Sequence, residues 1–328
     1  MSNETFRALM ARKTEAGQSI AIETITEADL PEADVTVDVE YSSFNYKDGL
    51  ALKGLSRILR ALPMVPGIDF AGTVRSSASP DFQPGDKVVL TGWGVGENWS
   101  GGFAQRARVK GEWLVKLPEG LSSRQAMAIG TAGLTAMLCV DALERYGIAA
   151  GGNVLVTGAA GGVGSVAVRL LSRLGYKVSA LTGRRSEEDF LKSIGATDIV
   201  DRDTYAVAGK PLQGERWHGA VDTVGGPILA NVLASTVYGG AVAACGLAAS
   251  TDLPTTVFPF ILRNVALLGV DSVNCPTQRR AHAWTRLAEL LEPGDLDLVT
   301  QEVGLDDLPK LADDIIAGRV RGRTVVRT

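Results

Sequence analysis

A glycine-rich turn between a strand and a helix is the feature that most constrains this chain. Residues 157–165 have the sequence Thr-Gly-Ala-Ala-Gly-Gly-Val-Gly-Ser. They begin at the end of an apolar run, 153–157, and lead into 163–174, whose apolar residues recur on one helical face. Glycines permit a tight turn and close approach of a ligand, and the helix N-terminus offers free N–H groups to an anion. The pattern predicts a dinucleotide diphosphate at Ala160, Gly161, Gly162 and Val163, with a purely structural turn as the alternative.

The chain changes character near residue 123, which predicts two domains. Before it, strand-like segments such as 35–39, 103–109 and 113–115 are punctuated by Gly and Pro, which indicates a mostly β domain. After it, helical stretches alternate with short apolar strands at 153–157, 177–181, 220–222 and 241–245, which indicates an α/β, doubly wound parallel sheet. The last residues end in a strand at 324–327, which we expect to pack on the first domain. The predicted domains are 1–123 with 293–328, and 124–292.

Composition excludes several classes of protein. The net charge of −4 gives no basic surface for nucleic acid or a membrane. The three cysteines, Cys139, Cys245 and Cys275, are odd in number and far apart, so we expect no disulfide framework and a cytoplasmic location. The uncharged run 223–251 contains several glycines, and we interpret it as a buried helix and a buried strand separated by Gly239-Gly240.

The second strand of the predicted dinucleotide-binding sheet indicates which dinucleotide binds. An NAD site usually has Asp or Glu at the end of this strand. Here the strand ends in Leu-Thr-Gly-Arg-Arg-Ser, and the first acid is Glu187. Thr182, Gly183 and Arg184 instead suit a 2′-phosphate, which predicts NADPH; the alternative is a solvated loop arginine.

Four segments carry a resemblance to a known family: 45–48, 66–74, 130–136 and 158–164. With them the chain resembles the medium-chain dehydrogenase/reductase superfamily, in its zinc-free, quinone-oxidoreductase-like branch. The resemblance implies a GroES-like, mostly β catalytic domain, a Rossmann domain, and a cleft between them.

Longer strings at 91–98, 244–248, 253–264 and 269–273 look like the acrylyl-CoA reductase group. That resemblance implies reduction of acryloyl-CoA, or a similar small enoyl-CoA, to the saturated ester by NADPH. It also implies further residues at the NADPH site: Tyr46, Arg202, Leu247, Ile261, Ser272 and Arg323.

A catalytic zinc is not expected. Zinc-dependent members of the superfamily carry Gly-His-Glu where this chain has Gly67-Ile68-Asp69. A catalytic zinc needs three protein ligands, and the only histidines are His218 and His282, both in the later part of the chain.

Without a metal, hydrogen-bond donors must stabilise the charge that develops on the substrate oxygen. Tyr46 is the first candidate, since a phenol donates without ionising, and Asn45 is the second; the alternatives are a structural tyrosine and a turn-forming asparagine. Thr131 is expected near the cofactor or as a helix cap. The loop 92–102, with five glycines and two tryptophans, is expected to close over the site as a lid, with a structural turn as the alternative.

Other functions and the assembly state are also predicted. A quinone or enone reductase is the alternative within the same fold, and a non-catalytic NADPH-binding protein is the alternative from another class. The apolar segment 262–270 is expected at the edge of the Rossmann sheet, where pairing across a two-fold axis would form a homodimer.

Overall fold

A computed structural model describes residues 4–15 and 17–328, and the chain divides into two compact units. The first comprises Met1–Leu134 and Ser272–Thr328, and the second comprises Thr135–Asp271. The sequence placed 124–134 and 272–292 in the second domain, whereas their contacts place them in the first unit. Part of the reason is Arg280, which is buried and donates to the backbone oxygen of Thr91 in the first unit.

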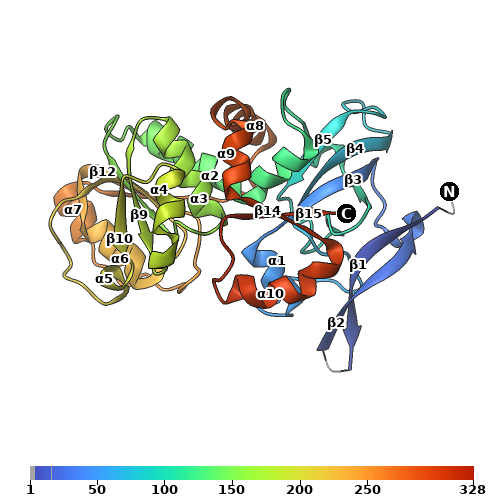
Figure 1. Cartoon of the computed structure of the whole chain (residues 1–328), viewed down its shortest axis with the longest axis horizontal. Coiled ribbons are helices and arrows are strands. Elements are labelled where there is room, and N and C mark those ends of the chain that lie inside the picture. The colour runs from blue at the N-terminus through green and yellow to red at the C-terminus, as the bar shows by residue number, and fades with distance from the viewer. Residues whose placement is uncertain (1–3, 16) are drawn as a thin grey trace. The chain divides into compact units, whose positions relative to one another are not determined.

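The first unit is built on a mixed sheet that the sequence predicted as a mostly β domain. Its strands follow the order β14-β15-β3-β4-β5-β7, with β6 paired to β3. Figure 1 labels β14, β15, β3, β4 and β5 of this sheet. Their bounds are β3 (Val35–Phe44), β4 (Asp69–Ser77), β5 (Lys87–Thr91), β6 (Arg106–Val109), β7 (Val115–Lys116), β14 (Thr300–Gly304) and β15 (Arg323–Arg327). A hairpin of β1 (Thr5–Thr14) and β2 (Gly17–Thr26) forms a separate sheet. The helices are α1 (Tyr46–Leu52), α8 (Thr277–Leu290), α9 (Pro293–Val299) and α10 (Leu308–Ile316).

The end of the chain joins this first sheet, as predicted. β15 pairs antiparallel with β3, and β14 pairs parallel with β15. Two predicted strands are shorter than expected. The strand expected at 103–109 begins at Arg106, because the Phe103 N–H donates to Pro66 O outside the main sheet. The strand expected at 113–115 is mostly a 3-10 helix, Gly111–Trp113.

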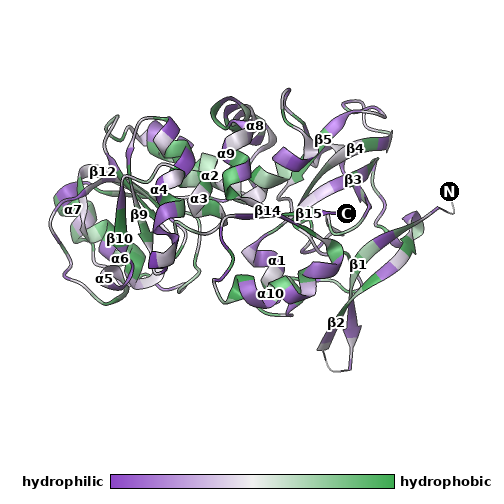
Figure 2. Ribbon diagram, in the orientation of Figure 1, coloured by the Kyte–Doolittle hydropathy of each residue, from purple (hydrophilic) through white to green (hydrophobic). Residues whose placement is uncertain are grey.

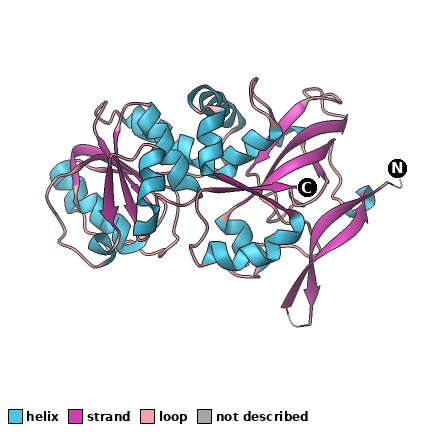
Figure 3. Cartoon of the chain, viewed as in Figure 1, coloured by secondary structure: helices cyan, strands magenta, loops and turns pink. Residues whose placement is uncertain are grey.

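The second unit is the predicted doubly wound sheet, flanked by helices (Figure 3). Its strand order is β10-β9-β8-β11-β12-β13, all parallel. The strands are β8 (Asn153–Thr157), β9 (Lys177–Thr182), β10 (Asp198–Asp201), β11 (Trp217–Asp222), β12 (Thr236–Ala244) and β13 (Ala266–Gly269). The helices are α3 (Gly162–Arg173), α4 (Glu188–Ser193), α5 (Asp203–Ala206), α6 (Gly226–Ala234) and α7 (Phe258–Arg263).

Hydropathy explains why these strands are central. The strands of this sheet are coloured as apolar in Figure 2, and the side chains of Val154, Leu155 and Val156 are fully buried. Successive strand residues point to opposite faces, so a run buried at every position requires cover on both faces. Leu155 packs in one apolar cluster with Leu229 and Val232 of α6.

The uncharged run 223–251 forms a buried helix, α6, and a buried strand, β12, as predicted, but the Gly-Gly pair lies elsewhere. Gly239 and Gly240 are inside β12, where the pairing with β11 shifts register. Gly239 has φ +72°, and a Cβ on Gly240 would lie 2.8 Å from His218 O. The pair therefore marks an irregularity within the strand, and the helix ends earlier, at Ala234.

Within residues 4–15 and 17–328, one helix, α2 (Ser123–Tyr146), is long and apolar enough to cross a membrane. However, 89% of its most apolar window is buried within the protein. This burial is typical of a core helix. Gly130, with φ +53° and ψ −161°, interrupts the helical backbone of α2.

Candidate functional site

The glycine turn lies in the second unit between β8 and α3, where the sequence placed it. Gly158 has φ +59°, and Gly161 is the residue before the first turn of α3. A Cβ on Gly164 would lie 2.3 Å from Gly158 O, so this position requires glycine. The twelve-residue helix α3 directs its N-terminal N–H groups at the turn. The turn and the helix end therefore fit a dinucleotide diphosphate, with Ala160, Gly161, Gly162 and Val163 along it.

Two guanidinium groups lie near the end of β9: Arg184 follows β9 itself, and Arg202 directly follows the neighbouring strand β10. A Cβ on Gly183 would lie 2.5 Å from the guanidinium carbon of Arg202, so glycine lets that side chain pack on the backbone. Arg184 donates from Nη2 to Ala160 O at 3.3 Å, which connects it to the glycine turn. Thr182 is 5% exposed, and its hydroxyl oxygen accepts from the Arg184 N–H at 3.1 Å. The structure thus brings the predicted 2′-phosphate residues together.

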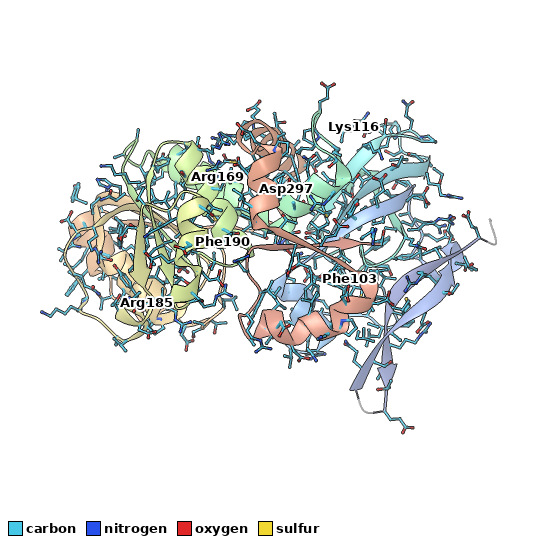
Figure 4. All side chains as sticks on the ribbon, in the orientation of Figure 1. Phe103, Lys116, Arg169, Arg185, Phe190 and Asp297 are labelled. Atoms are coloured by element: carbon cyan, nitrogen blue, oxygen red, sulfur yellow. The ribbon has the colours of Figure 1, made fainter. Side chains whose placement is uncertain are left out.

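The acids near this position are already paired with arginines. Glu187 lies 3.9 Å from Arg184, and Asp203 lies 3.8 Å from Arg202. Asp201, at the end of β10, lies 3.1 Å from Arg185, which Figure 4 labels. The Asp203 backbone N–H and the Arg185 guanidinium hold the pKa of Asp201 below its ordinary value. Arg185 has a side chain 80% exposed, so it points to solvent.

Tyr46 begins α1 in the first unit and is 41% exposed. Its phenol makes no hydrogen bond to any residue that the structure describes. It is therefore available to a ligand, which its predicted role as a donor requires.

Asn45, directly before Tyr46, lies inside the protein with 8% exposure. Its Nδ2 donates within 3.0–3.3 Å to Ser43, Asp48 and Asp69, and its Oδ1 accepts from Arg323 at 3.1 Å. Both amide hydrogens have internal acceptors. The geometry does not support the prediction that this amide donates to the substrate, because burial favours pairing it within the protein.

Arg323 is also internal. Its side chain is 1% exposed and donates to Asn45 Oδ1, Ser43 Oγ and Ala128 O. Burial lowers the pKa of Arg323, and the charges of Asp69 and Asp48 act in the opposite direction. The guanidinium implied at the NADPH site therefore supports residues around Tyr46.

Asp48 and Asp69 complete this buried polar cluster. Burial and the charge of Asp69 raise the pKa of Asp48 to about 7, against hydrogen bonds from Asn45 and Ile68. Asp69 accepts from the Thr131 N–H at 2.8 Å, so it caps the segment of α2 that follows Gly130. The sequence predicts Thr131 near the cofactor or as a helix cap, whereas the capping group in the structure is the Asp69 carboxylate and Thr131 contributes its backbone N–H.

The remaining residues implied at the cofactor site lie on two units. Leu247, after β12, is 63% exposed, and Ile261, on α7, is 68% exposed, both in the second unit. Large apolar side chains at such exposure suit contact with a ligand. Ser272 is half-buried at the start of the second segment of the first unit.

The loop 92–102 is a packed structure, which corrects the prediction of a mobile lid. A Cβ on Gly96 would lie 2.6 Å from Gly67, and one on Gly101 would lie 2.0 Å from Gly67 O. Trp99 donates to Arg108 O at 2.8 Å and packs edge-on against Trp113. The glycines serve close packing against the backbone at Gly67, and this packing opposes opening of the loop.

Sequence reasoning missed Ser43 and did not select Asp69 as a site residue. The available signal was Asp69 itself, a charge between the apolar residues Ile68 and Phe70. A buried carboxylate requires partners, so its place in an apolar run indicates a polar cluster.

The doubly wound unit has a glycine turn with two arginines close to it, and the mostly β unit has an exposed phenol. These are features of a medium-chain dehydrogenase/reductase. Residues 31–119 match the alcohol dehydrogenase GroES-like domain, and residues 162–292 match the family described as zinc-binding dehydrogenase. The chain belongs to the acrylyl-CoA reductase group, in the quinone-oxidoreductase-like branch of this superfamily, and is an oxidoreductase.

Three relatives support this assignment. The "Probable acrylyl-CoA reductase AcuI" of Escherichia coli (strain K12) is 54% identical over 98% of this chain and 99% of its own. The yhdH oxidoreductase of Salmonella enterica, crystallised in complex with NADP, is 56% identical, with a TM-score of 0.96 over 98% of this chain and 99% of that one.

The third relative is YhfP of Bacillus subtilis, described as a putative quinone oxidoreductase and 46% identical over 98% of each chain. Its crystal structure has NAD bound and gives a TM-score of 0.95, at 45% identity, over 99% of this chain and 100% of that one.

Proposed function

We propose that this oxidoreductase uses NADPH to reduce the activated carbon–carbon double bond of acryloyl-CoA, or a similar small enoyl-CoA, to propionyl-CoA or its homologue without a metal. The observation that carries the proposal is the 54% identity to an acrylyl-CoA reductase over almost the whole of both chains. The overall reaction consumes one NADPH and one proton for each double bond reduced.

The chemistry divides between cofactor and protein. NADPH, when bound, supplies the hydride to the β-carbon of the enoyl thioester. Negative charge then develops on the thioester oxygen, and a hydrogen-bond donor there lowers the barrier. The exposed phenol of Tyr46 in the first unit is the donor proposed for this role. The α-carbon receives its proton from a side chain or water.

The preference for NADPH follows from charge at the end of β9. Arg184 follows β9, where an NAD enzyme would have an acid, and the Arg202 side chain packs by Gly183 next to it, whereas Asp201 is paired with Arg185. A relative of 56% identity is crystallised with NADP, whereas YhfP is crystallised with NAD, so NADH is the competing cofactor. The ratio of kcat/KM for NADPH and NADH tests this; a higher value for NADH would reject it.

The absence of a metal from the reaction is part of the proposal. No group of three His, Cys, Asp or Glu side chains that would hold a metal ion occurs among residues 4–15 and 17–328. His218, one of the two histidines, accepts a hydrogen bond from the Asn153 backbone N–H at its Nδ1. Activity should therefore survive dialysis against a chelator.

A quinone or enone reductase is the second candidate, favoured by the description of YhfP. Both substrate classes accept hydride at a conjugated carbon. NADPH oxidation measured with acryloyl-CoA, crotonoyl-CoA, free acrylate and a quinone separates them by kcat/KM. A quinone preferred over every enoyl-CoA would favour the second candidate; NADPH binding with no turnover of any of them would favour a non-catalytic protein.

We also propose a cytoplasmic homodimer that binds neither nucleic acid nor membrane. In support, β13 lies at one end of the second sheet's strand order, and Leu267 on it is 37% exposed. Leu262, in α7 before this strand, is 56% exposed, and Tyr238 on β12 is 70% exposed. Pairing with a second copy would cover this edge. A monomer by light scattering at micromolar concentration would reject the dimer.

A further inference from the structure

We propose that Asp69 and Arg323 are positioning residues for the reduction: together they fix the Asn45-Tyr46 segment relative to the helix break at Gly130-Thr131. The inference rests on the proposed function, because its test needs an enoyl-CoA that the protein reduces. It concerns the first unit alone, which contains all of these residues.

Asp69 joins two segments that are far apart in the sequence. Its Oδ2 accepts from the Asn45 amide at 3.2 Å and from the Thr131 backbone N–H at 2.8 Å. Its Oδ1 accepts from the Ser43 backbone N–H at 3.0 Å. One fully buried carboxylate therefore holds the residues that precede Tyr46 and the residue that restarts α2.

Arg323, on β15, makes hydrogen bonds to the same two segments. Its Nη1 donates to Asn45 Oδ1 at 3.1 Å, and its Nε donates to Ala128 O at 2.9 Å. Its Nη2 donates to Ser43 Oγ at 2.8 Å, and that hydroxyl also lies 2.8 Å from Asp69. Ser43 is thus shared by the buried cation and the buried anion, so Ser43, Asp69 and Arg323 form one buried polar cluster.

The lack of a side chain at Gly130 leaves the space that this buried polar cluster occupies. A Cβ at this position would lie 2.5 Å from Arg323 Nη2, 2.6 Å from Ser43 Oγ and 3.0 Å from Asp69 Oδ2. Its φ of +53° also breaks the helix, which frees the Thr131 N–H for Asp69. The helix break at Gly130 and the buried polar cluster therefore depend on each other.

This arrangement orients groups on its border without itself facing a ligand. Asp69 is fully buried and Arg323 is 1% exposed, whereas Tyr46, next to Asn45, is 41% exposed. Buried charges often contribute little to stability compared with apolar side chains of the same volume. Their contribution here is the fixed geometry of the Tyr46 segment, on which hydride transfer depends steeply.

The test compares two variants at the buried polar cluster with two matched controls. Asp69→Asn replaces an acceptor oxygen with a donor, and Gly130→Ala adds a methyl group against Arg323. The controls are Asp295→Asn, at a buried acid that accepts from the Glu292 N–H in α9, and Gly120→Ala, at φ +87° with nothing within 4 Å among the described residues. Each is measured for Tm, Kd for NADPH, and kcat and KM for acryloyl-CoA.

We expect Asp69→Asn and Gly130→Ala to lower kcat at least about tenfold, with Kd for NADPH changed less than about threefold. The controls should lose a similar Tm and keep kcat within about twofold of wild type. A kcat that follows Tm across all four variants would show a merely structural role and overturn the inference. Wild-type protein that reduces no enoyl-CoA would instead overturn the proposed function.

A milder set keeps the test decisive if those variants do not fold. Ser43→Ala removes only the shared hydroxyl and retains both charges, and we expect a several-fold lower kcat in a folded protein. Arg323→Lys retains the charge with fewer donors, so it should keep more of the wild-type kcat than Arg323→Met. Unchanged kcat in Ser43→Ala, together with equal kcat in the two Arg323 variants, would overturn the inference.

Discussion

The Asp48→Asn variant should change how the stability of this protein depends on pH. Asp48 is fully buried in α1, two residues after Tyr46, and its pKa is raised from 3.8 to about 7 by burial and by the charge of Asp69. A carboxyl group whose pKa is higher in the folded state holds its proton more tightly there. Its contribution to stability is complete below the unfolded pKa and is lost as pH rises through the folded pKa.

The magnitude follows from the shift. A difference of roughly 3 pH units at 1.36 kcal/mol each corresponds to about 4 kcal/mol, lost between about pH 4 and pH 7. Between pH 5 and pH 7 the free energy of unfolding of wild type should therefore fall by about 2 kcal/mol relative to Asp48→Asn, which has no proton to lose. Above pH 8 the difference should be constant.

Urea unfolding of both proteins at pH 5, 6, 7 and 8 measures this difference. Each pH requires a single transition with equal m-values before the midpoints are converted to free energies. Parallel pH profiles for the two proteins would refute the reasoning, and so would a wild type that gains stability relative to the variant as pH rises.

Three further predictions concern ligands and turnover. Arg184→Ala and Arg202→Ala should each raise the KM for NADPH about tenfold or more and leave the KM for NADH within about twofold, because a charge-assisted hydrogen bond contributes roughly 1.5–3 kcal/mol; equal losses for both cofactors in steady-state assays would contradict this. Tyr46→Phe should lower kcat several-fold with an unchanged Kd for NADPH in fluorescence titration, and wild-type kcat would exclude the phenol. Gly164→Ala, whose Cβ would lie 2.3 Å from Gly158 O, should weaken NADPH binding about tenfold or more and lower the thermal midpoint, whereas wild-type values would show that the turn tolerates the methyl group.

Local patterns in the sequence predicted the elements that depend on local physics. The strand at 153–157 has the predicted bounds, and α3 begins at Gly162, one residue before its predicted start. Both are set by apolar periodicity and by glycines within one short segment. The edge position of the last strand was also predicted, although β13 begins only at Ala266, because Asn264 ends α7 in a left-handed conformation.

Contacts across long stretches of sequence could not be predicted in this way. Asp69 meets Ser43, Thr131 and, through Ser43, Arg323, and no periodicity connects residues separated by up to 280 positions. The close packing of the loop 92–102 could not be predicted either. Its glycines suggested mobility, and their close approach to Gly67 is seen only in the folded chain. Phe103, labelled in Figure 4, packs within this same region.

Metal-free reduction of an enoyl thioester by NADPH is tested most directly by product analysis after metal removal. The protein is dialysed against a chelator and incubated with NADPH and acryloyl-CoA, and propionyl-CoA is quantified against NADPH consumed. We predict one propionyl-CoA per NADPH, at the rate measured before dialysis. No propionyl-CoA from the untreated protein, or activity lost on dialysis and restored by zinc, would contradict the account.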